Sequence, residues 1–211
     1  CVAMNVNDLI CVGAKPVSMV DYIGCSFTDA RIFSEIGKGL AEGARQGDIS
    51  ISGGEISQIK EIINGVDLIG ACIGHVPLDK VNTGKDIQPG NIIIGLASSG
   101  VHSNGLTLAR KILLGETREE QERNVNKFEK RLGRTLGEEL LEPTSIYVKP
   151  IMEMLEDSIN LKAMVHITSG GYSNLNRVEN DNIRFVINPS PPVPEVFKLI
   201  QEQGEVSDAE M

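Results

Sequence analysis

The stretch SSGVHSNG, residues 98–105, constrains the fold more than any other part of the sequence. A short apolar run at 92–97 leads into it, and an amphipathic run at 106–114 follows it. This order predicts a strand, a tight loop and a helix. The glycines, serines and asparagine of the loop tolerate unusual backbone angles and offer polar groups, and the following helix would point free backbone N–H groups at them. Such a loop favours an anion such as phosphate.

His102 lies inside this loop, where an imidazole can hold or move a proton near neutral pH. The alternative is a plain connection, in which Ser103 or Asn104 only caps the helix. The loop has neither the Gly-Lys-Ser/Thr ending of a Walker loop nor a GxGxxG pattern. The sequence therefore does not support a P-loop NTPase or a dinucleotide-binding fold.

Composition excludes several classes of function. The chain has 211 residues, enough for one large or two small domains. A formal charge of −9, no Trp and few aromatic residues leave no basic patch or stacking platform, so we expect no nucleic-acid partner and no membrane partner. No apolar run approaches the roughly 20 residues that span a bilayer, and the start lacks a charged-then-apolar leader. Four cysteines without CxxC spacing fit a reduced compartment, and we expect a cytoplasmic protein.

The first third of the chain alternates helix and strand patterns. Helical periodicity covers residues 2–12 and the segment between Thr28 and Gly47, and strand patterns cover 17–23, 48–52 and 66–76. Asn5 and Asp8 are three residues apart, so they share one face of the first helix. The strand at 48–52 runs into Gly53, Gly54 and Glu55, which we expect to form a turn that presents the Glu55 carboxylate.

A domain boundary is predicted where glycines, prolines and charges gather, near residues 82–88, which gives domains at 1–84 and 85–211. Beyond the loop, the charged segment 115–134 is expected to be a solvated helix or a surface excursion. The remaining patterns predict helices at 143–155 and 194–203 and strands at 163–167 and 182–187. The strand at 163–167 ends at a second glycine-containing loop with Gly170 and Gly171, which leads into a short helical run.

Seven segments, taken in order, resemble one family, the phosphoribosylformylglycinamidine cyclo-ligases, also called aminoimidazole ribonucleotide synthetases. The segments are AMNVNDLICVGAKP, MVDYI, ISGGEIS, VDLIGACIG, LASSGVHSNGLTLARKIL, LEPTSIYVKPI and HITSGGYSNL. Their order and spacing make the resemblance specific, and it covers almost the whole chain apart from the charged segment 115–134.

The resemblance implies a fold and a reaction. The fold would be an N-terminal α+β domain, which pairs with its twin in a homodimer, followed by a C-terminal α/β domain. The reaction would be a step of purine biosynthesis, in which ATP phosphorylates the formyl amide oxygen of formylglycinamidine ribonucleotide and a substrate nitrogen closes the imidazole ring. The product would be 5-aminoimidazole ribonucleotide, with ADP and phosphate released.

The resemblance also implies site residues, with ATP and Mg²⁺ as cofactors. On the substrate side, His102 would be catalytic, and the substrate-binding residues would be Ser99, Ser103, Asn104, Gly170 and Gly171. On the ATP and metal side, Asp8 and Glu55 would hold Mg²⁺, with Asn5, Gly53 and Gly54 beside them. Carboxylate and amide oxygens suit Mg²⁺, which prefers oxygen ligands.

Two departures from the family pattern leave alternatives open. Ser169 stands where the family usually has the first glycine of a GGG run, and the family's early DGVGTK-type segment would precede Cys1. We therefore expect the chain to be truncated at both ends. The alternatives are another ATP-using member of the superfamily, such as a thiamine-monophosphate kinase, or an inactive fragment that only folds and binds.

Overall fold

The computed structural model describes residues 1–208 and 210–211. These form two compact units. The first unit comprises Cys1–Pro89, Ile146–Ile167 and Tyr172–Ile183, and the second comprises Gly90–Ser145, Thr168–Gly171 and Arg184–Met211. The first unit thus takes in two segments from beyond the boundary predicted at residue 84, and we describe each unit by itself.

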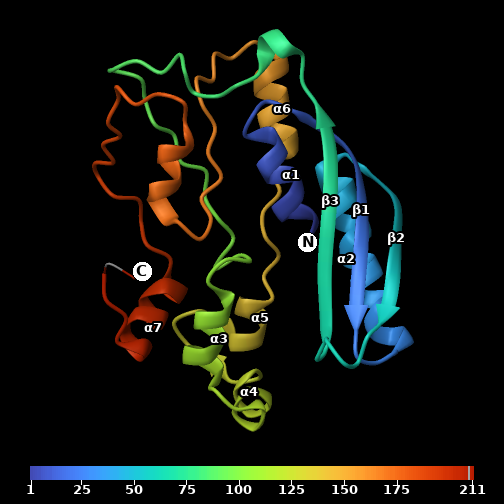
Figure 1. Cartoon of the computed structure of the whole chain (residues 1–211). Helices are drawn as coiled ribbons and strands as arrows, with labels where there is room; N and C mark the ends of the chain where they lie inside the picture. Colours follow the sequence, from blue (N-terminus) through green and yellow to red (C-terminus); the bar gives the residue numbers. More distant parts are fainter. Residues whose placement is uncertain (209) are drawn as a thin grey trace. The chain divides into compact units, whose positions relative to one another are not determined.

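A three-stranded sheet with helices on one face forms the first unit (Figure 1). Its strands are β1 (Lys15–Cys25), β2 (Ser50–Gln58) and β3 (Val66–His75), in the order β2-β1-β3. β1 pairs with β2 in parallel and with β3 antiparallel. The parallel pair is joined by α2 (Ala30–Gly47), as a crossover connection requires. The three strands predicted in this part of the chain are confirmed.

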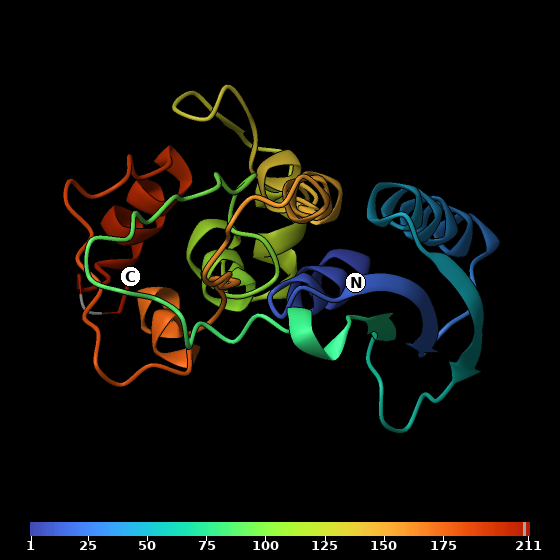
Figure 2. The same ribbon diagram turned by 90° about the horizontal axis from the view of Figure 1, so that it is seen from above.

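The core of this unit forms where α1 (Val2–Ile10) packs on the sheet. Val2, Val6 and Ile10 recur at helical spacing and are buried together with Met19 of β1. Val148 and Ile151 of α6 (Val148–Glu156) complete the same cluster. Figure 2 shows α1 and α2 on one side of the sheet.

The opposite face of this sheet carries exposed apolar side chains. A Cβ placed on Gly70 of β3 would lie 2.2 Å from Met19 Cε and 2.7 Å from Asn5 Nδ2, so Gly70 and Met19 face α1. Because neighbouring residues of a strand point to opposite faces, Val20 and Ile69 point away from the helices. They are 48% and 53% exposed.

The turn predicted at Gly53–Glu55 is wrong, because β2 continues through these residues to its end at Gln58. Gly54 pairs with Asp21 of β1, and a Cβ on Gly54 would lie 2.5 Å from Asp21 Oδ1. Because Gly54 has no side chain, it leaves room for the side chain of Asp21 on the neighbouring strand. The register shifts next to it, since Met19 pairs with Ile51 and Val20 with Gly53, which is the signature of a β-bulge.

Helices and one short hairpin make up the second unit. Its elements are α3 (Leu106–Leu114), α4 (Arg118–Asn124), β4 (Phe128–Glu129), β5 (Arg134–Thr135), α5 (Leu136–Leu140) and α7 (Glu195–Gly204). Ala109 and Leu113 of α3 form its core with Leu136 of α5 and with Val196 and Leu199 of α7. The helices predicted after the 98–105 loop and at 194–203 are confirmed, and the one predicted at 143–155 is present but begins only at Val148.

Three predicted strands are not strands in this structure: the segments 92–97, 163–167 and 182–187 are irregular. Ile92 and Ile94 are 87% and 78% exposed, so the first of these runs buries little apolar surface. A strand is stable only when its backbone pairs with a neighbouring strand, and an apolar sequence does not by itself provide that neighbour.

Two 3₁₀ helices, η1 (Leu78–Lys80) and η2 (Gly171–Arg177), complete the secondary structure of the described residues. Within the described part of the chain, no helix is long and apolar enough to cross a membrane.

Candidate active site

The 98–105 loop is closed by hydrogen bonds between Ser99 and His102. The main-chain N–H of Ser99 donates to His102 Nε2 at 2.9 Å, and Ser99 Oγ lies 2.8 Å from the same nitrogen. The Ser99 hydroxyl also donates to the carbonyl oxygen of Pro143 at 2.6 Å. His102 has a φ of +61°, a left-handed conformation that is uncommon for a residue other than glycine.

The helix after the loop begins without a side-chain cap. Gly105 is the N-cap of α3, with a φ of +89°, and as a glycine it makes no side-chain cap hydrogen bond. The capping alternative for Ser103 and Asn104 is therefore not what the structure shows. Free N–H groups at a helix start favour an anion, and phosphate binding by this loop stays a prediction.

An ion-pair network around one buried carboxylate, that of Glu139, lies next to the loop. Gly100 is buried, and a Cβ placed there would lie 3.7 Å from Glu139 Oε1. Glu139 of α5 is only 7% exposed, and Arg134 Nε donates to its Oε2 at 2.6 Å. Arg134 also pairs with Glu142, which directly precedes the carbonyl that holds Ser99. The loop is therefore docked on residues 139–143.

In the first unit, Asp8 has a histidine partner that the sequence analysis did not single out. His166 Nδ1 lies 2.8 Å from Asp8 Oδ1, and the side chains of His166 and Asp8 are 9% and 61% exposed. His166 lies in the HITSGG segment that resembles the family, so the resemblance could have indicated it as a candidate site residue. Asn5, one turn before Asp8, donates through Nδ2 to the carbonyl of Cys1 at 3.0 Å.

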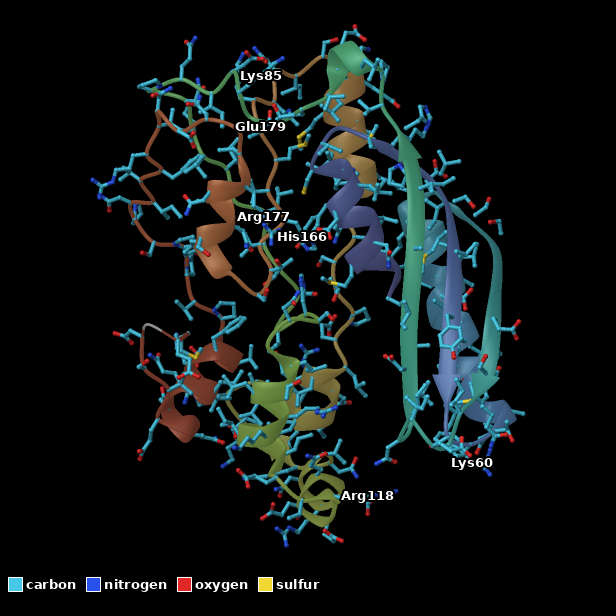
Figure 3. The ribbon with its side chains drawn as sticks, viewed as in Figure 1. Lys60, Lys85, Arg118, His166, Arg177 and Glu179 are labelled. Atoms are coloured by element: carbon cyan, nitrogen blue, oxygen red, sulfur yellow. The ribbon has the colours of Figure 1, made fainter. Side chains whose placement is uncertain are left out.

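A cavity of about 310 Å³ opens beside this pair. Figure 3 labels His166 and Arg177, which both line it. Its lining includes Asp8, Cys11, Asn82, Thr83, His166 and Arg177. Burial raises the pKa of the Cys11 thiol, and the charge of Asp8 raises that pKa further. Asn82 Oδ1 and Thr83 Oγ1 are buried and have no hydrogen-bond partner among the described residues. The cavity therefore combines an exposed carboxylate, a histidine and two unsatisfied polar atoms.

The structure does not bring Glu55 to Asp8. Gly54 shares a face with Asp21, on the helix side, so the next residue, Glu55, points from the opposite face of the sheet. Within one copy, α1 with Asp8 and the side chain of Glu55 are separated by the sheet. Across residues 1–208 and 210–211, no group of three or more His, Cys, Asp and Glu side chains is placed to hold a metal ion.

Of the two predicted glycines in the second loop, Gly171 has the clearer backbone role. Its N–H donates to the carbonyl of Thr168 at 3.0 Å, and its φ is +53°. Gly171 also begins η2, which agrees with the short helical run predicted after this loop. A substrate contact at Gly170 and Gly171 stays a prediction.

The fold is that of a mixed α+β protein in which a polar loop, residues 98–105, precedes α3. The crystal structure of Escherichia coli HypE aligns with a TM-score of 0.54 at 19% identity, covering 82% of this chain and 48% of that one. This likeness concerns the fold alone.

The chain belongs to the AIR synthase related protein family. The model of the family's N-terminal domain matches residues 1–76, and the model of its C-terminal domain matches residues 88–211. The chain is 48% identical over 203 residues to a phosphoribosylformylglycinamidine cyclo-ligase of Pyrococcus furiosus, covering 96% of this chain and 57% of that protein. It is 44% identical over 211 residues to the cyclo-ligase of Methanocaldococcus jannaschii, covering 100% of this chain and 59% of that protein. The chain thus spans somewhat more than half the length of these relatives.

Proposed function

We propose that the protein containing this chain is a phosphoribosylformylglycinamidine cyclo-ligase. It would convert formylglycinamidine ribonucleotide and ATP into 5-aminoimidazole ribonucleotide, ADP and phosphate, a step of purine biosynthesis. The observation that carries this proposal is the identity of 44–48% to curated cyclo-ligases over 96–100% of the chain. The names of these relatives favour the cyclo-ligase over a thiamine-monophosphate kinase.

The 98–105 loop would hold the phosphorylated substrate. Its support is the uncapped start of α3 together with the ordered His102 ring. In this proposal Ser103 and Asn104 contact the substrate directly, with Ser99, Gly170 and Gly171 as further binding residues. His102 stabilises charge that develops during ring closure.

ATP and Mg²⁺ are part of the proposal, with Asp8 as the principal metal ligand. Mg²⁺ supplies charge neutralisation to a transferring phosphoryl group. Asp8 fits this role because its carboxylate is 61% exposed and Oδ1 is already oriented by His166, which leaves Oδ2 for a cation. Asn5 lies one turn away on α1. Glu55, with Gly53 and Gly54, remains proposed for the ATP and metal side, but not as a ligand of the same ion in the same copy.

We further propose a cytoplasmic homodimer that pairs through the open face of the sheet. Val20 and Ile69 support this assignment, because both are about half exposed on the face that no helix of this unit covers. Contiguous exposed apolar residues of this kind are typical of protein interfaces.

The test is a product assay on the full-length protein. Purified protein is incubated with ATP, Mg²⁺ and formylglycinamidine ribonucleotide, and phosphate release and the aminoimidazole product are measured in parallel. Thiamine monophosphate replaces the ribonucleotide in a second reaction. Stoichiometric imidazole and phosphate support the cyclo-ligase, whereas ATP consumption only with thiamine monophosphate would overturn it in favour of the kinase. The isolated 211-residue chain in the same assay tests whether this part alone turns over its substrate, and calorimetry with ATP tests whether it binds without turnover.

A further inference from the structure

A fully buried polar side chain, that of Asn7, lies in the core of the first unit. It is 1% exposed and belongs to α1, where Val6 and Ile10 are buried apolar residues. Burying an amide lowers stability unless its polar atoms are hydrogen-bonded, and an apolar residue of similar size would fill the same space without that requirement. Packing alone therefore does not explain an asparagine at this position.

The Asn7 amide binds the start of α6. The main-chain N–H of Tyr147, the N-cap residue of α6, donates to Asn7 Oδ1 at 3.0 Å. α1 and α6 lie side by side (Figure 1), and Val6 and Val148 belong to the same core cluster. Apolar contacts are non-directional, so they determine the rotation of one helix against the other only weakly. The hydrogen bond, in contrast, fits a single alignment of α1 on α6.

The same alignment directs the next residue, Asp8. Successive residues of an α-helix are about 100° apart around its axis, so the direction of Asn7 toward α6 also sets that of Asp8. Asp8 lines the cavity, and its Oδ1 lies 2.8 Å from His166 Nδ1. Both contacts lie within the first unit, and both join the segment matched by the N-terminal family model to the one matched by the C-terminal model.

We propose that Asn7 is a positioning residue, whose hydrogen bond with the Tyr147 N–H fixes the alignment of α1 on α6 and thereby holds Asp8 against His166. The use of Asp8 as a metal ligand rests on the proposed function. The alignment itself is a property of the fold, and it is testable without ATP, metal or turnover.

The first test follows the Tyr147 amide by hydrogen exchange, measured by NMR on the full-length protein. The reference is the amide of Asp157 at the other end of α6, which donates to the carbonyl of Glu153. We expect both amides to be protected in the unsubstituted protein. Asn7→Leu approximately keeps the side-chain size but removes the acceptor, and should raise the exchange rate of Tyr147 relative to Asp157 about tenfold, the scale of one lost hydrogen bond. An unprotected Tyr147 amide before substitution, or an unchanged ratio after it, would overturn the proposal.

The second test reads the contact between Asp8 and His166 in spectra of protein labelled with ¹⁵N at histidine. The His166 ring signals are assigned by their loss in His166→Asn. They should shift in Asp8→Asn, because this variant removes the charge of the carboxylate that lies 2.8 Å from the ring. We expect Asn7→Leu to shift the same signals, since it releases the alignment that brings Asp8 to the ring.

The matched control is Val6→Ala, which removes apolar volume from a neighbouring residue that is 0% exposed. It should lower stability without shifting the His166 signals or changing the exchange ratio of Tyr147 to Asp157. Asn7→Ala, which also removes the acceptor, replaces Asn7→Leu if the leucine variant does not fold. Unshifted His166 signals in a folded Asn7 variant, or an equal shift in Val6→Ala, would overturn the positioning role of Asn7, whether or not the protein cyclises its substrate.

Discussion

At the scale of single residues, His102 is the side chain whose surroundings are most specific. It lies in the loop predicted from the sequence, where the main-chain N–H of Ser99 donates to its Nε2 and Ser99 Oγ lies 2.8 Å from the same nitrogen. We expect His102→Ala to lower kcat/KM for ring closure by about 10²–10⁴-fold, the usual contribution of a positioned proton donor or acceptor. Steady-state kinetics of the full-length protein measure this. His75→Ala, an exposed site on β3, is the control, and equal kcat/KM in the two variants would exclude a role for His102.

Asp8 allows a separate test on the metal side. Asp8→Asn keeps the size of the side chain but removes the charge that a Mg²⁺ ligand contributes. We expect a higher Mg²⁺ concentration for half-maximal turnover and a weaker Mg²⁺-dependent binding of ATP by calorimetry. Asp79→Asn, at the exposed 3₁₀ helix η1, removes a charge outside the proposed site. Unchanged Mg²⁺ dependence in Asp8→Asn would remove the support for this ligand.

Cys11 gives a prediction that depends on pH. Its pKa is raised chiefly by burial, so the reactive thiolate forms only at a pH above the ordinary range for a thiol. At pH 7.5 we expect alkylation of Cys11 to be at least about tenfold slower than that of the exposed Cys1, with a rise as the pH approaches the raised value. Peptide mass spectrometry after timed iodoacetamide treatment measures both rates. Similar rates at pH 7.5 would contradict this reading of the cavity.

Some residue-level features could be predicted from the sequence and others could not. The polar loop around His102 was predictable because glycine, serine and asparagine cluster between periodic segments. The pairing of Asp8 with His166 joins residues 158 positions apart, and no local pattern encodes such a contact. The separation of Asp8 from Glu55 depends on strand alternation through a bulge, which shifts the side of the sheet on which each residue lies.

At the scale of secondary-structure elements, α5 and the segment after it form the platform of the loop. Glu139 is buried and paired with Arg134, so removing the arginine leaves a desolvated carboxylate. We expect Arg134→Gln to lower the free energy of unfolding by about 2 kcal/mol, between the scale for a fully buried ion pair and that for an exposed one, because Glu139 is buried and Arg134 is one-third exposed. Chemical denaturation followed by circular dichroism measures this loss.

The exposed pair of Arg118 with Glu122 on α4 provides the matched control for that variant (Figure 3). Its side chains are 87% and 65% exposed, and solvent screening leaves such pairs with little net effect. Arg118→Gln should therefore leave the denaturation midpoint unchanged. If the denaturation midpoint of Arg134→Gln equals that of Arg118→Gln, the ion pairs of Arg134 with Glu139 and Glu142 do not stabilise this part of the protein.

Elements differ in how far local pattern determines them. α1 is predictable because its apolar residues repeat at helical spacing and Gly13, with a φ of +77°, follows its end. The segment 92–97 has the composition of a strand, but its residues are irregular and exposed in this structure. Strand formation depends on a pairing partner, which a single apolar run does not contain, whereas a helix satisfies its own backbone groups.

At the scale of the whole molecule, the open face of the sheet predicts association between copies. In a C2 dimer both subunits use the same surface patch, so a single substitution there occurs twice in the interface. A charge introduced on this face would therefore be buried and desolvated in both subunits. We expect the full-length protein to sediment as a dimer and Ile69→Glu to weaken dimerisation at least about 100-fold, because a buried unpaired charge costs several kcal/mol. Ile32→Glu is the matched control, since Ile32 is 41% exposed on α2, on the other side of the sheet. Sedimentation velocity across a concentration series distinguishes the outcomes, and a dimer that survives Ile69→Glu as well as it survives Ile32→Glu would place the interface elsewhere.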